Sequence, residues 1–202
     1  MSFSEKLLSS VRSISICADL RNPRVLIDNL VFVHQLIVAS EQLIKAAILR
    51  LHASSPHGFD LDLLRYYRAH LEEERDHAEW LATDLKAVDV DPISQKLNLA
   101  AAELAGVQYY LAHHAHPAAL LGYMAVLECS PMPLDVVEEL EALHGTALLK
   151  TLRYHATHDV DHGADVQRML DRIPDELQNL VLQNAMMTAS KLSSAAARFG
   201  KD

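Results

Sequence analysis

The chain consists of long segments with helical spacing of apolar residues, separated by short breaks that contain proline or glycine. The segment 117–129 is apolar on nearly every face, which is typical of a helix in the interior of a protein. Alternation of the kind found in strands never extends beyond a few residues, and leucine and alanine dominate. The pattern therefore predicts an all-α fold.

The breaks predict where the helices begin and end. We find no internal repeat, low-complexity tract or linker, so residues 1–202 are expected to form a single helical domain. The expected helices are 3–20, one that opens at Asn22-Pro23 and ends before a loop at 55–58, 60–88, one from Asp91-Pro92 to about 116, 117–129, a short acidic helix that ends near Gly145, a long helix that ends near Ile173, and a last helix that starts at Pro174.

Composition excludes several classes of partner. The net charge is −9 and no run of lysine or arginine is present, which argues against binding to nucleic acid. Two cysteines, Cys17 and Cys129, make no disulfide framework and fit a reducing compartment. The N-terminal segment lacks the apolar core of a signal peptide, and no stretch is judged apolar enough to span a bilayer. We therefore expect a cytoplasmic protein that binds neither nucleic acid nor membrane.

Histidine is unusually frequent, with 12 residues, and two short motifs combine it with glutamate or aspartate. Glu74 and His77 are three positions apart, so on one helix they share a face and can approach one ion. Taken alone this pair is more often a solvated charged surface. His155, Asp159 and His162 have the spacing i, i+4 and i+7, which places two imidazoles and a carboxylate in one stripe.

Glu128 ends the apolar segment 117–129, where a carboxylate either reaches water or is paired inside the protein. His158 and Asp161 lie off the histidine stripe. They are candidates for surface residues or for residues that contact the metal ligands without binding the metal. The three carboxylates and three histidines together match what two bridged divalent ions need. This candidate metal set is Glu74, His77, Glu128, His155, Asp159 and His162.

A rival set follows the pattern of ferritin-like proteins, which combine single glutamates with Glu-x-x-His pairs. It consists of Glu41, Glu74 with His77, Glu103, and Glu141 with His144. His144 is next to Gly145, close to an expected helix end, and the rival set leaves the histidine stripe unused. We therefore favour the stripe.

The motifs resemble those of the haem-oxygenase-like di-metal oxidases and oxygenases, also called iron-containing redox enzymes. The likeness lies in HLEEERDHAEWLATDL, HPAALLGYMAVLE and LRYHATHDVDHGADV, within residues 70–168. It implies a haem-oxygenase-like bundle of seven to eight helices, a homodimer, and two iron ions that cycle between Fe(II) and Fe(III). Manganese, alone or paired with iron, suits the same ligands. In this family the first glutamate can stand seven residues before the histidine, where this chain has His70; His70 and Glu41 are open as further ligands.

The resemblance also implies an activity. O2 is the co-substrate, and a peroxo-diferric intermediate oxidises a small organic substrate by N-oxygenation, oxidative decarboxylation or C–C cleavage, with an electron donor as a further partner. Tyr123, Met124 and Leu127 are candidates for the substrate pocket, although ordinary core packing is the simpler interpretation. Three alternatives remain open: a metal-free thiaminase-like enzyme that uses Cys129, a haem- or cofactor-binding member with His34 as ligand, and a ferritin-like or non-enzymatic metal-binding protein.

Overall fold

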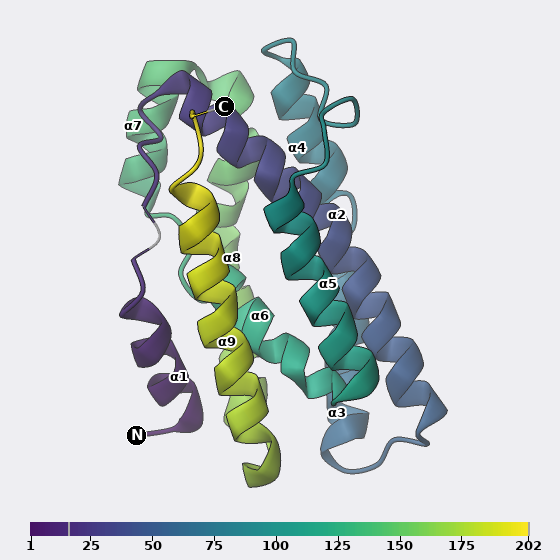
Figure 1. The fold of residues 1–202 in the computed structure, drawn as a ribbon. Helices are drawn as coiled ribbons and strands as arrows, with labels where there is room; N and C mark the ends of the chain where they lie inside the picture. Colours follow the sequence, from purple (N-terminus) through teal and green to yellow (C-terminus); the bar gives the residue numbers. More distant parts are fainter. Residues whose placement is uncertain (16, 202) are drawn as a thin grey trace.

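The computed structural model describes residues 1–15 and 17–201, except for the side chains of residues 159–161. Within this part the chain forms nine α-helices, two 3₁₀ turns and no strand (Figure 1). The elements are α1 (Phe3–Arg12), α2 (Pro23–Ala53), α3 (Phe59–Glu73), α4 (His77–Lys86), α5 (Leu99–His114), η1 (Pro117–Ala119), α6 (Leu120–Glu128), α7 (Leu134–His144), η2 (Thr146–Leu148), α8 (Lys150–Leu170) and α9 (Asp175–Ala196). The all-α class is confirmed, with slightly more helices than expected.

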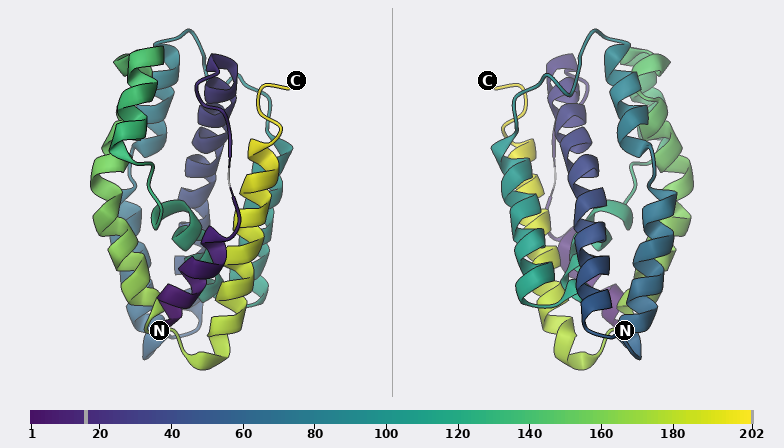
Figure 2. Two further views of the ribbon diagram at one scale, coloured as in Figure 1. Left: turned by 90° about the vertical axis from the view of Figure 1, so that its left-hand side faces the viewer. Right: turned by 90° about the vertical axis from the view of Figure 1, so that its right-hand side faces the viewer.

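Helix α6 is the central element of the fold. Every residue from Leu120 to Val126 is buried, as its apolar sequence predicts. Figure 2 shows this short helix in the interior, with long helices on either side. It packs mainly on α9 and α8, while α2 packs on α3, α4 and α5. Because Glu128 is the last residue of α6, its carboxylate is delivered to the middle of the bundle.

The apolar interior is divided into two clusters. The larger one includes Leu36, Leu120 and Tyr123, and the smaller one is built around Leu30 and Leu81. A cavity of about 260 Å³ is lined by residues from both clusters. This space between the two clusters is where the polar side chains described below are found.

The expected helix 60–88 is wrong as a single element, because α3 ends at Glu73 and α4 starts at His77. Between them Asp76 has a φ of +70°, a left-handed conformation that ends a right-handed helix. This break is the main reason why the structure has more helices than the sequence predicts.

Two other boundaries differ from expectation. Residues 13–15 and 17–20 do not continue α1, which ends at Arg12, and the Ser13 hydroxyl donates a hydrogen bond to the Ser10 carbonyl. Residues 91–98 precede α5 as a loop, because the Asp91 carboxylate accepts a hydrogen bond from the Ile93 N–H and forms a turn. Asn98, and not Asp91, caps the helix through the Ala100 N–H.

The expectation that no stretch is apolar enough to cross a bilayer is wrong for helix α2. By length and composition alone, Pro23–Ala53 meets that criterion. In the structure its buried residues pack on α3, α4 and α5, as in a core helix of a bundle. Its start is the predicted one: the Asn22 side chain accepts from the Arg24 N–H, and Pro23 takes the first helical position.

Gly122 allows α6 to approach α9 closely, which gives a first prediction. A Cβ at this position would collide with the Val181 carbonyl oxygen and lie 2.9 Å from the Ala185 nitrogen. Because backbone atoms cannot move aside easily, Gly122→Ala should reduce the free energy of unfolding by about 1–3 kcal/mol. Urea denaturation followed by circular dichroism would measure this.

Gly106 is the matched control, because it lies within α5 and a Cβ there would meet nothing within 4 Å. Gly106→Ala should stabilise the protein by about 0.5–1 kcal/mol, as expected for alanine in place of glycine in a helix. Equal effects of the two substitutions would contradict the close approach of α6 and α9.

Candidate metal centre

Glu74 and His77 come together at the break between α3 and α4, and not on one helix face. Glu74 caps the C-terminus of α3, and His77 is the first residue of α4. His77 Nδ1 lies 2.9 Å from Glu74 Oε2. The His77 side chain is only 1% exposed, and its other nitrogen, Nε2, is buried without a hydrogen-bond partner in the described part of the chain.

His155 on α8 completes a first group of ligands. One ligand atom each from Glu74, His77 and His155 lies within 4.8 Å of the others, close enough to hold one metal ion. The Nδ1–H of His155 donates to the Thr151 carbonyl at 2.8 Å, which leaves Nε2 with a lone pair. Metal-binding histidines are commonly fixed by such a bond from the other ring nitrogen.

The position of α8 depends on a buried carboxylate from α4. Leu149, just before the helix, gives no side-chain cap to α8. Instead, Asp84 Oδ2 accepts a hydrogen bond from the Thr151 N–H at 2.7 Å, and Asp84 is 3% exposed. A negative group at a helix N-terminus is favourable because it meets the free N–H groups and the positive end of the helix dipole. Asp84 thereby ties the two helices that carry His77 and His155.

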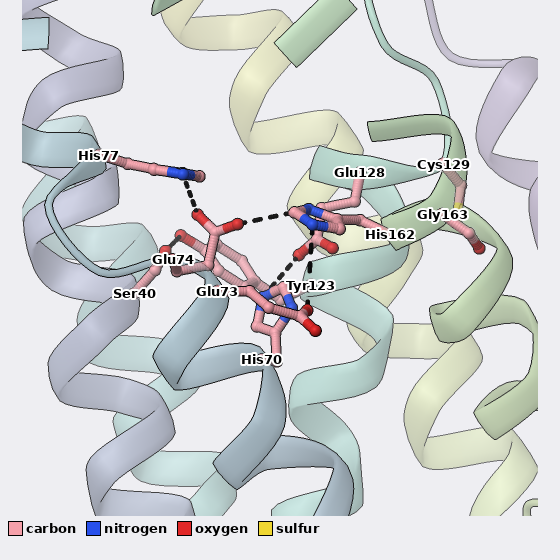
Figure 3. Close-up of polar contacts among 10 residues, drawn as sticks. All are labelled: Ser40, His70, Glu73, Glu74, His77, Tyr123, Glu128, Cys129, His162 and Gly163. Atoms are coloured by element: carbon pink, nitrogen blue, oxygen red, sulfur yellow. Dashed lines mark hydrogen bonds and ion pairs between the residues drawn. The ribbon is translucent and has the colours of Figure 1, made fainter. Parts of the chain in front are cut away.

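A second polar group lies on the other side of Glu74. His162 Nδ1 is 3.5 Å from Glu74 Oε1, and His70 Nε2 is 3.2 Å from Glu128 Oε1. Figure 3 shows the Glu74 carboxylate between His77 and His162, with Glu128 and His70 next to His162. Glu128 Oε2 is buried and has no hydrogen-bond partner among the described residues.

The charges of this cluster favour ionised carboxylate at its centre. Burial raises the pKa of Glu74, but the hydrogen bond from His77 and the charges of His77, His70 and His155 outweigh it and lower the pKa below its usual value. Burial lowers the pKa of His70, and the opposing hydrogen bond to Glu128 and the nearby glutamates raise it overall. An anionic Glu74 is the form that binds a cation.

Aromatic rings pack against one side of the first group of ligands, a feature that was not predicted from the sequence. The ring centroids of Trp80 and His77 lie 4.5 Å apart, and the Tyr154 ring contacts both of these rings. Trp80 is the single tryptophan of the chain and stands three residues after His77, one helical turn away. That spacing was the available signal. These rings shield His77 from water.

Five of the six predicted ligands meet in this region: Glu74, His77, Glu128, His155 and His162. The sixth, Asp159, has its side chain outside the described part of the structure. His158 points away from the cluster, since it is exposed and stacks on Tyr154 with ring centroids 4.0 Å apart.

The rival set is dispersed. Glu41 pairs with Lys45 on the same helix, and Glu103 pairs with Lys191 at 2.7 Å. Glu141 is bound by the Arg153 guanidinium, and His144 Nε2 contacts the Leu20 carbonyl at 3.0 Å. The structure therefore brings none of these four residues to Glu74 and His77.

Cys129 is not set up as a nucleophile. Its thiol is buried and contacts the Gly163 carbonyl at 3.5 Å. Burial, with a further contribution from the charge of Glu128, raises the pKa of Cys129 to about 12. The thiol is therefore protonated at neutral pH. His34, the residue considered for haem, lies on α2 and lines a separate surface groove.

The residues present fit a metal centre. Buried His77 Nε2 and Glu128 Oε2 have no hydrogen-bond partner within the described structure, and unpaired buried polar atoms are costly unless a ligand satisfies them. Imidazole and carboxylate are the donors that iron and manganese accept. The cavity of about 260 Å³ opens directly on Glu74, Glu128 and His155.

Comparison with known proteins places this site in a family. The family described as iron-containing redox enzyme matches residues 70–191, which include every candidate ligand from His70 to His162. This chain belongs to the iron-containing redox enzyme family. The resemblance inferred from the motifs is thereby confirmed. A search of curated proteins gives no match.

Solved structures agree on the fold of this family member. A TenA homologue from Pseudomonas syringae pv. tomato has a TM-score of 0.74 at 13% identity, covering 97% of this chain and 91% of that chain. A domain of unknown function with a haem-oxygenase-like fold from Shewanella denitrificans has a TM-score of 0.58 at 18% identity, covering 96% and 88%. At such low identity the likeness shows the haem-oxygenase-like fold alone.

The two Glu-x-x-His pairs of the chain give a second prediction. His77→Ala removes a buried ligand, so the affinity for Co(II) should fall by at least ~100-fold, the upper end of the loss seen when only the hydrogen-bond partner of a ligand is removed. Equilibrium dialysis with metal analysis would measure it.

His144→Ala is the matched control, because His144 belongs to the second pair and contacts the Leu20 carbonyl. It should bind Co(II) as the wild-type protein does. Weaker binding after both His77→Ala and His144→Ala would favour the ferritin-like set, which contains both histidines.

Proposed function

We propose that this protein is a non-haem di-iron oxidase or oxygenase that uses O2 to oxidise a small organic substrate. The observation that carries the proposal is the position of Glu74. Its Oε2 faces His77 and its Oε1 faces His162, so one carboxylate contacts two separate groups of ligands. A carboxylate so placed suits the bridge between two metal ions.

We assign one metal position to each of the two ligand groups. His77 and His155 would hold one ion together with Glu74, and His162 and Glu128 would hold the other with the opposite oxygen of Glu74. Asp159, from the same stripe of α8, is proposed as a further ligand. Bound iron would supply the electrons that reduce O2.

The protein itself contributes orientation and exclusion of water. Thr151 fixes the His155 ring through its carbonyl, and Glu74 fixes His77. Trp80 and Tyr154 cover the His77 side of the centre. Rings that exclude water from this side of a reactive centre reduce side reactions with water there.

The cavity beside Glu74 and Glu128 is the proposed substrate site. The predicted candidates Tyr123, Met124 and Leu127 all line it, as well as being part of the packed interior. Its α2 wall is apolar from Leu30 to Ile44 except for Ser40, whose hydroxyl is 2.8 Å from the Tyr123 hydroxyl. At 1.5 Å per residue this wall is about 21 Å long, so the shape favours a substrate with an extended apolar body.

The function is tested by anaerobic titration with Fe(II), followed by O2 uptake in the presence of alkylamines, fatty acids and amino acids. The wild-type protein should bind two iron ions per chain and consume O2 with at least one of these classes. His155→Ala should lose O2 uptake, whereas His158→Ala, which removes an exposed histidine one turn away, should retain it. Iron binding without O2 uptake in any class would instead identify a metal-binding protein.

The substrate site gives a separate prediction that needs no metal. Val33 lines the cavity, so Val33→Phe should fill part of it and weaken binding of decanol to the metal-free protein by about tenfold, equivalent to ~1.4 kcal/mol. Leu49→Phe is the control, because Leu49 is on the same helix but 69% exposed. Calorimetry would measure both affinities, and equal affinities would show that decanol binds elsewhere.

A further inference from the structure

His70 occupies a position that the six-ligand set does not explain. It lies on α3, one helical turn before Glu74, and is 3% exposed. Burial of a histidine that can be protonated is costly unless the ring has a defined partner. Its partner here is Glu128, with His70 Nε2 at 3.2 Å from Oε1.

Contacts on two sides hold the His70 ring in this orientation. The Tyr66 ring stacks on it with centroids 5.7 Å apart and planes 25° apart. The His162 ring makes an edge-to-face contact with it, with ring centroids 5.9 Å apart and ring planes at 75°. Because the ring is packed in this way, the direction of its Nε2–H bond is fixed, and it is directed at one oxygen of Glu128.

The two oxygens of Glu128 consequently differ. Oε1 is held by His70, whereas Oε2 is buried without a hydrogen-bond partner in the described part of the chain. A carboxylate at the end of a helix can rotate, and both oxygens would otherwise compete for the same cation. One oxygen tied to a donor leaves a single, defined oxygen for a metal.

We propose that His70 is a positioning residue that donates its Nε2–H to Glu128 Oε1 and so presents Oε2 to the second metal ion. This inference rests on the proposed two-metal function. It assigns to His70 the role of a hydrogen-bond donor and not that of an extra ligand. Binding of the ion at His77 and His155 does not depend on it.

Donor and ligand roles are separated by two substitutions at His70, studied by Co(II) titration of the metal-free protein. His70→Leu removes the donor and should weaken the second Co(II) by ~10–100-fold, while the first Co(II) binds normally. His70→Gln keeps an N–H donor and should recover most of that affinity. The visible spectrum of the first Co(II) should be the same in the wild-type protein and in both variants.

His34 provides the matched control for loss of a buried histidine. It is 7% exposed on α2 and lines a groove apart from the metal centre. His34→Leu and His34→Gln should both bind two Co(II) ions with wild-type affinity. Thermal unfolding by circular dichroism, measured on all four variants, identifies any loss that comes from misfolding.

The outcomes separate this inference from the function on which it rests. Unchanged affinity for the second ion in His70→Leu would overturn the role of His70 and leave the di-iron proposal intact. Equal weakening in His70→Gln and His70→Leu would show that a donor is not what matters and would also overturn it. A wild-type protein that binds no second ion would overturn both proposals.

Discussion

An ionised carboxylate inside an apolar helical bundle is stable only where cations or hydrogen-bond donors face it. Glu74 and Glu128 are in this position, between the two apolar clusters of the interior. Histidine nitrogens from α3, α4 and α8 lie within 3.5 Å of three of their four oxygens. Helices α3, α4 and α8 thus each bring an imidazole ring to one of those two side chains.

Helical periodicity and proline breaks were sufficient to predict the fold class, the buried position of α6 and the starts of α2 and α9. They failed at the break between α3 and α4. Apolar spacing continues through it, and Asp76 is an ordinary residue in a left-handed conformation that the rest of the structure imposes. A local pattern cannot report a conformation that packing between distant segments determines.

The candidate ligands were found from sequence because they are chemically unusual: a glutamate at the end of an apolar helix, and histidines in a helical stripe. The contacts that hold these ligands in place were not predicted from the sequence. Asp84 and Thr151 are common residue types in unremarkable positions, and their bond joins residues 67 apart in the chain. His70 was noticed only as a departure from a family pattern, and its contact with Glu128 required the packed structure.

The carbonyl group that orients His155 belongs to the backbone at Thr151. Every amino acid carries that group, so substitutions at position 151 can change the side chain without removing the acceptor. The Thr151 hydroxyl is itself buried with no hydrogen-bond partner in the described structure, and contributes nothing to this bond. Substitutions of the side chain at position 151 therefore leave the tautomer of His155 unchanged. At position 84 the acceptor of the Thr151 N–H is the side chain itself, so a substitution there removes the hydrogen bond. In related chains, Asp84 should vary less than Thr151.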